Sequence, residues 1–251
     1  MFKEEIGNEF IVIQEGTSEG TQIKYRKDGF WYKKDNRGHE GRAEYLVSKF
    51  MEFTSLKTSE YVTYEEGTIN GSSGCRSRNF LTGEEELITF YRLYYNEVGK
   101  DLSKVIGNMD TMEERIEYVV SFIKESCELD VKEYLSKIFM LDMISLNEDR
   151  HLNNLAIIMN GDKFTPAPIF DNGIALLTAN QSVNRHFPIV DNVKRVVARP
   201  FSGSHEKMME YFGKGFSVDV NSALDWLDTE PDSMERNVLK YQIERYKGIL
   251  N

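Results

Sequence analysis

Cysteine, proline and histidine are scarce in this sequence. Its 251 residues include two cysteines, five prolines and four histidines. Cys75 and Cys127 are too few for a disulfide-rich secreted fold, so we expect two reduced thiols and a cytoplasmic protein. The histidines form no H-x-x-x-H pair and the cysteines no C-x-x-C pair, so a zinc site is not expected.

Long apolar runs and an excess of basic residues are also missing. No run of about 18 apolar residues occurs, so no membrane-spanning helix is expected. The first residues, MFKEEI, lack the hydrophobic region of a signal peptide. The formal net charge of −10 argues against direct nucleic-acid binding, which needs a basic surface. With 40% hydrophobic and 29% charged residues, the composition is that of a soluble globular protein.

The amino-terminal part has the pattern of strands and turns around one helix. Short apolar or β-branched segments predict strands at residues 9–13, 22–26, 29–33, 61–64 and 78–81. The turn at 27–29 joins the second and third of them. The apolar spacing between residues 45 and 51 predicts a helix over 40–53.

From about residue 84 the pattern becomes helical. The capping box Thr111–Glu114 predicts the start of a helix, and a second helix is expected from about 130 to 146. Asn160-Gly161 predicts a hairpin, and three helices follow near 206–212, 221–228 and 232–248. We therefore predict an α+β protein of two lobes, a small β-rich lobe at 1–83 and a larger helical lobe at 84–251. A ligand is expected in the cleft between the two lobes.

Three polar residues have the order that phosphoryl transfer requires. Asn154 follows Asp149 by five residues, and Asp171 comes after an apolar, strand-like run. Carboxylate and amide oxygens are the ligands that Mg²⁺ prefers. Asp171-Asn172-Gly173 alone would suggest a polar turn, but the three residues in this order are similar to the catalytic loop and metal motif of protein kinases. Asp149 is then the catalytic base, and Asn154 and Asp171 are the magnesium ligands.

A lysine that pairs with the ATP phosphates is expected on a strand that follows a glycine-containing loop. Lys33 ends the predicted strand 29–33 and is our choice, and Lys34 is the alternative. A carboxylate from the next helix should hold this lysine. Glu44 is preferred over Glu40 for that role, although either could be an ordinary first-turn glutamate.

Three separate segments resemble the HipA-like serine/threonine kinases of bacterial toxin–antitoxin systems. The segment 18–24, SEGTQIK, resembles their S-x-x-G-A-Q-x-K glycine-rich motif, with one fewer residue before the glycine and Thr21 in place of alanine. The segment 147–154 resembles their D-x-H-x-x-N catalytic loop, and Phe170-Asp171 resembles their aromatic-Asp metal motif. The three separated segments extend the resemblance over the two lobes from about residue 16 to 175.

The resemblance implies a protein-kinase-like or phosphoinositide-kinase-like fold that uses ATP and Mg²⁺ and phosphorylates serine or threonine of a protein substrate. ATP would contact Lys33 and Glu44 and the loop residues Gly16, Ser18, Gly20 and Gln22. The resemblance also implies autophosphorylation of Ser18, with Thr17 and Thr21 as alternatives. A phosphate there should weaken ATP binding by charge repulsion.

The chain departs from the family in its amino-terminal part. Family members carry an additional subdomain before the glycine-rich segment, and here that segment begins almost at once. We therefore expect an antitoxin, or a separate chain equivalent to that subdomain, as a partner, and neither nucleic acid nor membrane as a direct one.

Two other functions use the same residues. One is a kinase of a small molecule or a lipid head group, and the other is a nucleotide-binding pseudokinase. Residues 77–81 are the predicted connection that receives adenine, with a buried structural strand as the alternative. His151 is expected to brace the catalytic loop through hydrogen bonds.

Overall fold

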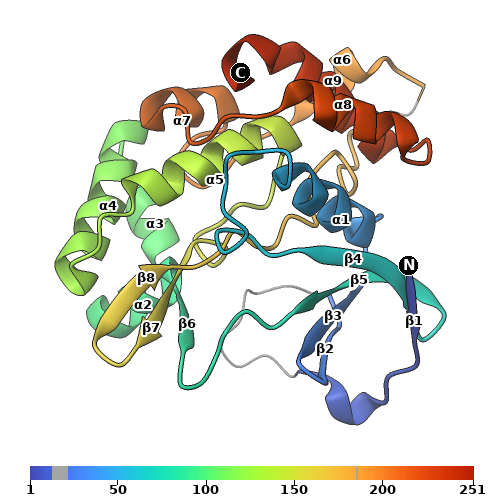
Figure 1. Ribbon diagram of the computed structural model, residues 1–251. Coiled ribbons are helices and arrows are strands. Elements are labelled where there is room, and N and C mark those ends of the chain that lie inside the picture. The colour runs from blue at the N-terminus through green and yellow to red at the C-terminus, as the bar shows by residue number, and fades with distance from the viewer. Residues whose placement is uncertain (13–21, 185) are drawn as a thin grey trace.

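The strands of the amino-terminal part form one five-stranded sheet (Figure 1). The computed structural model describes residues 1–12, 22–184 and 186–251. Across the sheet the order is β1 (Phe2–Glu4), β4 (Tyr64–Ile69), β5 (Ser72–Arg78), β3 (Phe30–Lys34) and β2 (Lys24–Lys27). The pair β1 and β4 is parallel, and the other neighbours are antiparallel. The strands predicted at 22–26 and 29–33 are thus confirmed within two residues.

Two tight hairpins connect the antiparallel strands. Asp28 and Gly29, between β2 and β3, have φ angles of 50° and 78°, and Asn70 and Gly71, between β4 and β5, have 50° and 75°. Positive φ at both central residues favours Asp-Gly and Asn-Gly pairs, because their twist matches that of the flanking strands. The hairpin at 27–29 was predicted. The sequence signal Asn70-Gly71 also marked the second one, but the small and polar residues of β5 hid its second strand.

Three predicted strands are wrong or displaced. Residues 8–10 form the 3₁₀ helix η1 (Asn8–Phe10), and only a single bridge joins Ile11 to Tyr25; residue 13 lies outside the described residues. Tyr61 makes one bridge to Ile169 before β4 begins at Tyr64. The segment 79–81 follows β5 as a connection. In each case the apolar pattern was present, but the backbone groups have few or no strand partners.

Helix α1 (Glu40–Met51) packs on the five-stranded sheet, above β4 and β5 in Figure 1. Its buried face includes Leu46, Val47 and Phe50, as the predicted helix required. The helix approaches β5 so closely that a Cβ on Gly41 would lie 2.5 Å from the carbonyl carbon of Gly74. Glycine at position 41 therefore allows the first turns of α1 to approach β5.

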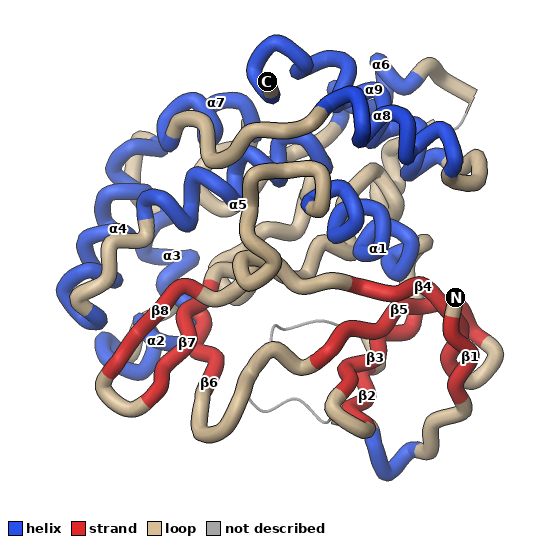
Figure 2. The backbone as a smooth tube through the Cα atoms, in the orientation of Figure 1, coloured by secondary structure: helices blue, strands red, loops and turns tan. Residues whose placement is uncertain are grey.

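The remaining chain forms a small second sheet and a group of helices, shown in red and blue in Figure 2. The antiparallel sheet contains β6 (Glu86–Thr89), β7 (Ala156–Asn160) and β8 (Lys163–Pro166). The helices are α2 (Phe90–Val98), α3 (Leu102–Gly107), α4 (Met112–Cys127), α5 (Lys132–Ser145), α6 (Ile189–Asn192), α7 (His205–Phe212), α8 (Val220–Thr229) and α9 (Met234–Leu250), with the 3₁₀ helix η2 (Val193–Arg195) after α6. The α+β class, the β7–β8 hairpin and the helices α4, α5, α7, α8 and α9 were predicted. The boundary at residue 83 stays a prediction.

Helix α5 forms the centre of the core. The sequence pattern indicated one apolar face, but nearly the whole helix from Tyr134 to Ser145 is buried. Its Phe139 stacks on Phe212 with ring centroids 5.3 Å apart and contacts Phe201 edge-on at 5.8 Å. A helix that is buried on all sides gives its last residue little freedom. The catalytic-loop segment that follows it therefore starts from a rigid support.

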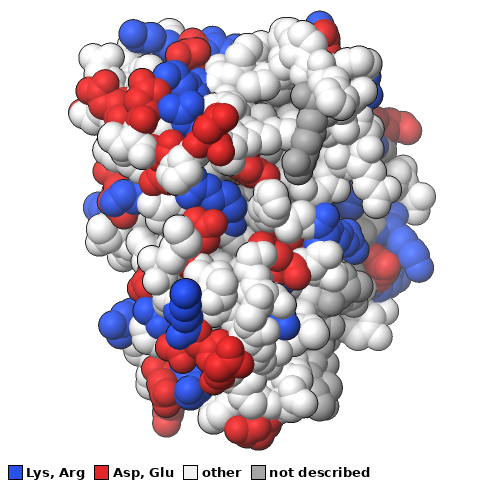
Figure 3. Space-filling model, turned by 90° about the vertical axis from the view of Figure 1, so that its right-hand side faces the viewer, with Lys and Arg blue, Asp and Glu red and all other residues white. Residues whose placement is uncertain are grey.

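Acidic and basic side chains are mixed on the face of the molecule in Figure 3. The net charge of −10 is therefore not gathered into one acidic patch on that face. Among the residues that the structure describes, no helix has both the length and the apolar character that crossing a membrane requires.

The cap of α4 gives a direct test of a local prediction. Thr111 accepts a hydrogen bond from the backbone of Glu114, whose side chain accepts one from the backbone of Thr111. We expect Thr111→Ala to lower the free energy of unfolding by about 1 kcal/mol, because the backbone N–H of Glu114 loses its acceptor. Urea denaturation measures this loss. The neighbouring Asp110→Ala is the matched control, and an equal loss in both variants would contradict a capping role.

Candidate active site

Lys33 joins the sheet to α1 and to the Asp171 turn. Its Nζ atom lies 2.6 Å from Glu44 Oε1 and 2.6 Å from Asp171 Oδ1. Lys33 and Glu44 are buried, and the Asp171 side chain is 21% exposed. The predicted contact between Lys33 and Glu44 is therefore present, and the same ammonium group also reaches the predicted metal ligand.

The charges of this cluster stabilise one another. Burial disfavours the ammonium of Lys33, but Asp171 and Glu44 outweigh it and raise the pKa of Lys33 well above its ordinary value. Burial opposes ionisation of Asp171 as well, but Lys33 and then Lys24 hold the pKa of Asp171 well below its usual range. Burial raises the pKa of Glu44 in spite of Lys33. Lys33 and Asp171 are thus both charged at neutral pH.

Lys24 belongs to the same cluster and was not predicted. It lies opposite Lys33 in the β2–β3 pair, and burial and then Lys33 lower its pKa, against the opposing effect of Asp171. Residues directly opposite in an antiparallel pair point to the same face of the sheet. Lys24 and Lys33 therefore form a pair of cations on that face. The signal was present, since Lys24 ends the segment that resembles the glycine-rich motif.

The rejected alternatives have other positions. Lys34 lies at the end of β3, and its backbone N–H donates to the carbonyl of Ile23. The carboxylate of Glu40 accepts hydrogen bonds from the backbone N–H groups of residues 36, 37 and 38. Glu40 thus holds the loop before α1, whereas Glu44, one turn later, reaches Lys33.

Asp171 sits at a backbone position of positive φ, 61°. Positive φ is uncommon for a residue other than glycine, although aspartate tolerates it better than most. Glu44 Oε2 accepts a hydrogen bond of 2.8 Å from the backbone N–H of Asn172, and the hydroxyl of Tyr64 lies 3.4 Å from the backbone nitrogen of Asp171. The glutamate therefore holds both Lys33 and the turn that presents Asp171.

The predicted catalytic loop, residues 147–154, places Asp149 at the surface of the site. The Asp149 side chain is 44% exposed, and its N–H donates to Asn147 Oδ1 at 3.0 Å. The carbonyl of Asn147 is in turn 2.8 Å from His205 Nε2, which ties the loop to the start of α7. The Asp149 carboxylate is therefore accessible from solvent and held on a fixed backbone.

Asn154 and His151 complete the loop. The amide nitrogen of Asn154 donates to the carbonyl of Asp149 at 3.0 Å, and its buried Oδ1 atom has no hydrogen-bond partner among the described residues. His151 braces the loop through its backbone N–H, which donates to the Asp149 carbonyl, and its Nε2 atom is 3.8 Å from Asp149 Oδ2. The expected bracing by His151 is thus a backbone contact.

A buried arginine connects the catalytic loop to the Asp171 turn. Arg150 is fully buried and forms a two-point ion pair with Asp142 of α5, with the closest distance 2.9 Å. It also donates to the carbonyl of Phe170 at 2.9 Å and to Asn172 Oδ1 at 2.7 Å. Arg150 therefore contacts the residues on both sides of Asp171. The sequence carried one signal of this, an aspartate at 142 inside the otherwise apolar run 138–144 of α5.

The glycine-rich segment is placed only in part. Gly16, Ser18 and Gly20, with the alternatives Thr17 and Thr21, lie outside the described residues. Gln22 is described, and its side chain donates to the backbone carbonyl of Lys34 at 2.7 Å. In this structure Gln22 therefore links the two strands that carry Lys24 and Lys33.

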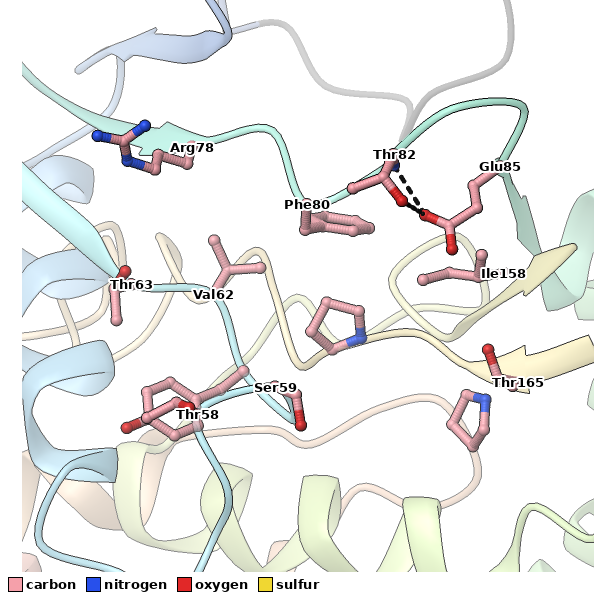
Figure 4. A pocket seen from close by; sticks show the side chains of 13 residues that line it. Thr58, Ser59, Val62, Thr63, Arg78, Phe80, Thr82, Glu85, Ile158 and Thr165 are labelled. Atoms are coloured by element: carbon pink, nitrogen blue, oxygen red, sulfur yellow. Dashed lines mark hydrogen bonds between the residues drawn. The ribbon is translucent and has the colours of Figure 1, made fainter. Parts of the chain in front are cut away.

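The connection from β5 to β6 borders a pocket of about 410 Å³ (Figure 4). Phe80 and Ile158 line it, and beside them Glu85 accepts hydrogen bonds from Thr82 (Figure 4). The ring of Phe80 also lies 6.0 Å from that of Phe170, next to Asp171. The predicted adenine-binding segment 77–81 is thus half strand and half connection, and its role in binding stays a prediction.

Comparison with solved structures places the fold. The structure is similar to the proinflammatory kinase CtkA of Helicobacter pylori, with a TM-score of 0.59 and 15% identity over 98% of this chain and 92% of that chain. It is also similar to HipA in the Shewanella oneidensis MR-1 toxin–antitoxin complex with HipB and operator DNA, with a TM-score of 0.55 and 11% identity over 93% of this chain and 66% of that one. The chain has the fold of HipA-like kinases.

Sequence comparisons add no closer relative. No family model matches the chain, and no curated protein sequence does. At 11–15% identity the structural likeness establishes the fold, and the chemistry has to be argued from the residues themselves.

The Arg150 ion pair gives a test of what holds the site together. We expect Arg150→Met to destabilise the protein by about 3–5 kcal/mol, since Asp142 would remain buried without its partner. Adding Asp142→Leu should recover a large part of this loss, because no charge is then left in the core. Urea unfolding of the two single variants and the double variant measures the coupling. Additive losses would contradict the pairing.

Proposed function

We propose that this protein is an ATP-dependent kinase that transfers the γ-phosphoryl group of ATP to a serine or threonine hydroxyl of a protein. The observation that carries the proposal is the Lys33 bridge, with Nζ 2.6 Å from both Glu44 and Asp171. A strand lysine, a helix glutamate and the aspartate of a metal motif are the parts that protein kinases use to hold ATP. The likeness of the fold to CtkA and HipA supports the same function.

Each residue has a distinct task in this reaction. Lys33 neutralises phosphate charge, with Lys24 beside it on the neighbouring strand, and Glu44 keeps Lys33 directed toward the Asp171 turn. Asp149 accepts the proton of the attacking hydroxyl, which makes the oxygen a better nucleophile. Arg150 and Asn172 hold the backbone around Asp171. In phosphoryl transfer most of the catalysis comes from positioning and electrostatic stabilisation, which such a fixed arrangement supplies.

The residues present fit a magnesium ion. The buried Oδ1 atom of Asn154 lacks a hydrogen-bond partner among the described residues, and Asp171 is ionised because its pKa is held low by the nearby cations. A buried acceptor without a donor is costly unless a cation or water satisfies it. Asn154 and Asp171 would hold the ion. When bound, Mg²⁺ neutralises the charge that develops on the transferred phosphoryl group.

A partner protein belongs to the proposal as well. The neighbouring structure of HipA contains HipB, so we propose that an antitoxin-like protein or a separate subdomain binds this chain. The same active site could also serve a small-molecule or lipid kinase. Transfer of ³²P from labelled ATP to protein, compared with transfer to free small molecules, separates these substrates. No labelled product of any kind would favour a nucleotide-binding pseudokinase.

The first functional prediction concerns Asp149. We expect Asp149→Asn to lower the rate of phosphoryl transfer by about 10²–10⁴-fold, because an amide cannot accept the hydroxyl proton. The fold should be unchanged, since the side chain is 44% exposed. The rate is measured with labelled ATP at saturating magnesium. Asp162→Asn, at an exposed position in the β7–β8 turn, is the matched control; more than about a third of wild-type turnover in Asp149→Asn would exclude a general base.

The second functional prediction compares the two metal ligands. We expect Asp171→Ala to weaken magnesium-dependent nucleotide binding more than Asn154→Ala does, because a carboxylate brings a full charge to the ion and an amide only a dipole. Asp171→Ala also removes the contact with Lys33. Calorimetric titration of nucleotide with and without magnesium separates that effect from the metal-dependent part of the binding free energy. Equal losses in the two variants, or binding that ignores magnesium, would argue against this ligand pair.

A further inference from the structure

The segment that follows the Asp171 turn, up to about residue 199, contacts the predicted catalytic loop at Glu148. Glu148, the residue before Asp149, accepts hydrogen bonds of 2.8 Å from the amide of Asn180 on both carboxylate oxygens. One of these oxygens also lies 3.5 Å from the backbone nitrogen of Val197. Glu148 therefore contacts the segment at two places, residue 180 and residue 197, and holds both next to Asp149.

The second half of this segment, residues 187–197, exposes apolar side chains to solvent. Phe187 is 46% exposed, Val190 40% and Val197 59%, and all three lie within eleven residues. Three exposed apolar side chains in one short stretch give a partner apolar surface to contact there. The segment itself is ordered by its own contacts, since the side chain of Asn192 bonds the backbone N–H and carbonyl of Asn184.

The same stretch is basic, although the whole chain is acidic. Lys194, Arg195 and Arg199 are exposed, and Asp191, which pairs with Lys194 at 3.2 Å, is the acidic residue between positions 186 and 199. The guanidinium of Arg195 lies 5.4 Å from the centre of the Phe187 ring. A basic and apolar stretch in a chain of net charge −10 selects a partner with acidic and apolar side chains.

We propose that this substrate-docking surface, formed by Phe187, Val190, Lys194, Arg195, Val197 and Arg199, binds an extended acidic and apolar segment next to the phosphorylated hydroxyl of the protein substrate. The inference rests on the proposed kinase function, because it is the position beside Glu148 and Asp149 that makes the bound segment a substrate. Val197 takes an apolar side chain near the acceptor hydroxyl, and the basic residues take carboxylates farther along.

The test uses the full chain with MgATP and a library of peptides, each with one serine acceptor and varied flanking residues. For the wild type we expect enrichment of Asp and Glu together with Leu, Ile, Val or Phe among the phosphorylated peptides. Two peptides from this library, matched except for acidic or basic flanks, then give a ratio of kcat/KM. This ratio is a readout that a purely structural role of the surface would leave unchanged.

Substitutions then assign the preference to the surface. We expect Arg199→Glu to lower the acidic-to-basic ratio by about two- to fivefold, with a smaller change at high salt because the charges are screened. Val197→Ser should lower the preference for an apolar flank by about fivefold. Lys100→Glu and Val98→Ser are matched controls, since both residues are exposed and lie near α2 and α3, at the opposite end of the molecule from α6 in Figure 1. Both controls should keep the wild-type ratio.

The possible failures are distinguishable. Phosphorylation without enrichment of acidic and apolar flanks, or the same ratio in Arg199→Glu as in the wild type, overturns the docking surface and leaves the kinase function in place. Absence of any transfer or hydrolysis of MgATP by the wild type overturns the kinase function, and the docking surface falls with it.

Discussion

The buried ion pairs of Lys33 are the contact on which the site depends. One ammonium group joins β3, α1 and the Asp171 turn through two distances of 2.6 Å. A charge in the protein interior is costly unless it is paired, so none of these three elements can move away without leaving an unpaired charge. Glu44 adds a second link between α1 and the Asp171 turn, because its other oxygen accepts a hydrogen bond from the backbone N–H of Asn172. Sheet, helix and turn are therefore held in one arrangement.

Arg150 extends this arrangement into the helical part. It contacts the carbonyl of Phe170 and the side chain of Asn172, and its guanidinium is neutralised by Asp142 of the buried helix α5. Glu44 on one side and Arg150 on the other thus enclose the left-handed backbone of Asp171. A substitution at Asp142 would leave the buried guanidinium of Arg150 without its counter-charge, so it should disturb the contacts on both sides of Asp171.

Several elements could be predicted because their signals are local. The Asp28-Gly29 and Asn160-Gly161 hairpins, the Thr111–Glu114 capping box and the helical periodicity of α4 and α9 each depend on a few neighbouring residues. The strands at 61–64 and 78–81 failed for the opposite reason, since a strand needs at least one neighbouring strand to pair with and the apolar pattern says nothing of that neighbour. The polar strand β5 was missed although it is the centre of its sheet.

The sequence by itself determined the chemical groups of the site: a strand lysine, a helix glutamate, and an Asp, Asn and Asp in the order of a phosphoryl-transfer site. Spacing along the chain is enough for this, because the loop 147–154 and the turn after Phe170 are both short. Only the tertiary structure decided between Lys33 and Lys34 and between Glu44 and Glu40 as the contacting pair, and it added Lys24 and Arg150. These choices depend on which side of its strand or helix each residue occupies and on which residue lies opposite. The packing of α1 and α5 decides both, because it brings together residues more than a hundred positions apart, such as Lys33 and Asp171.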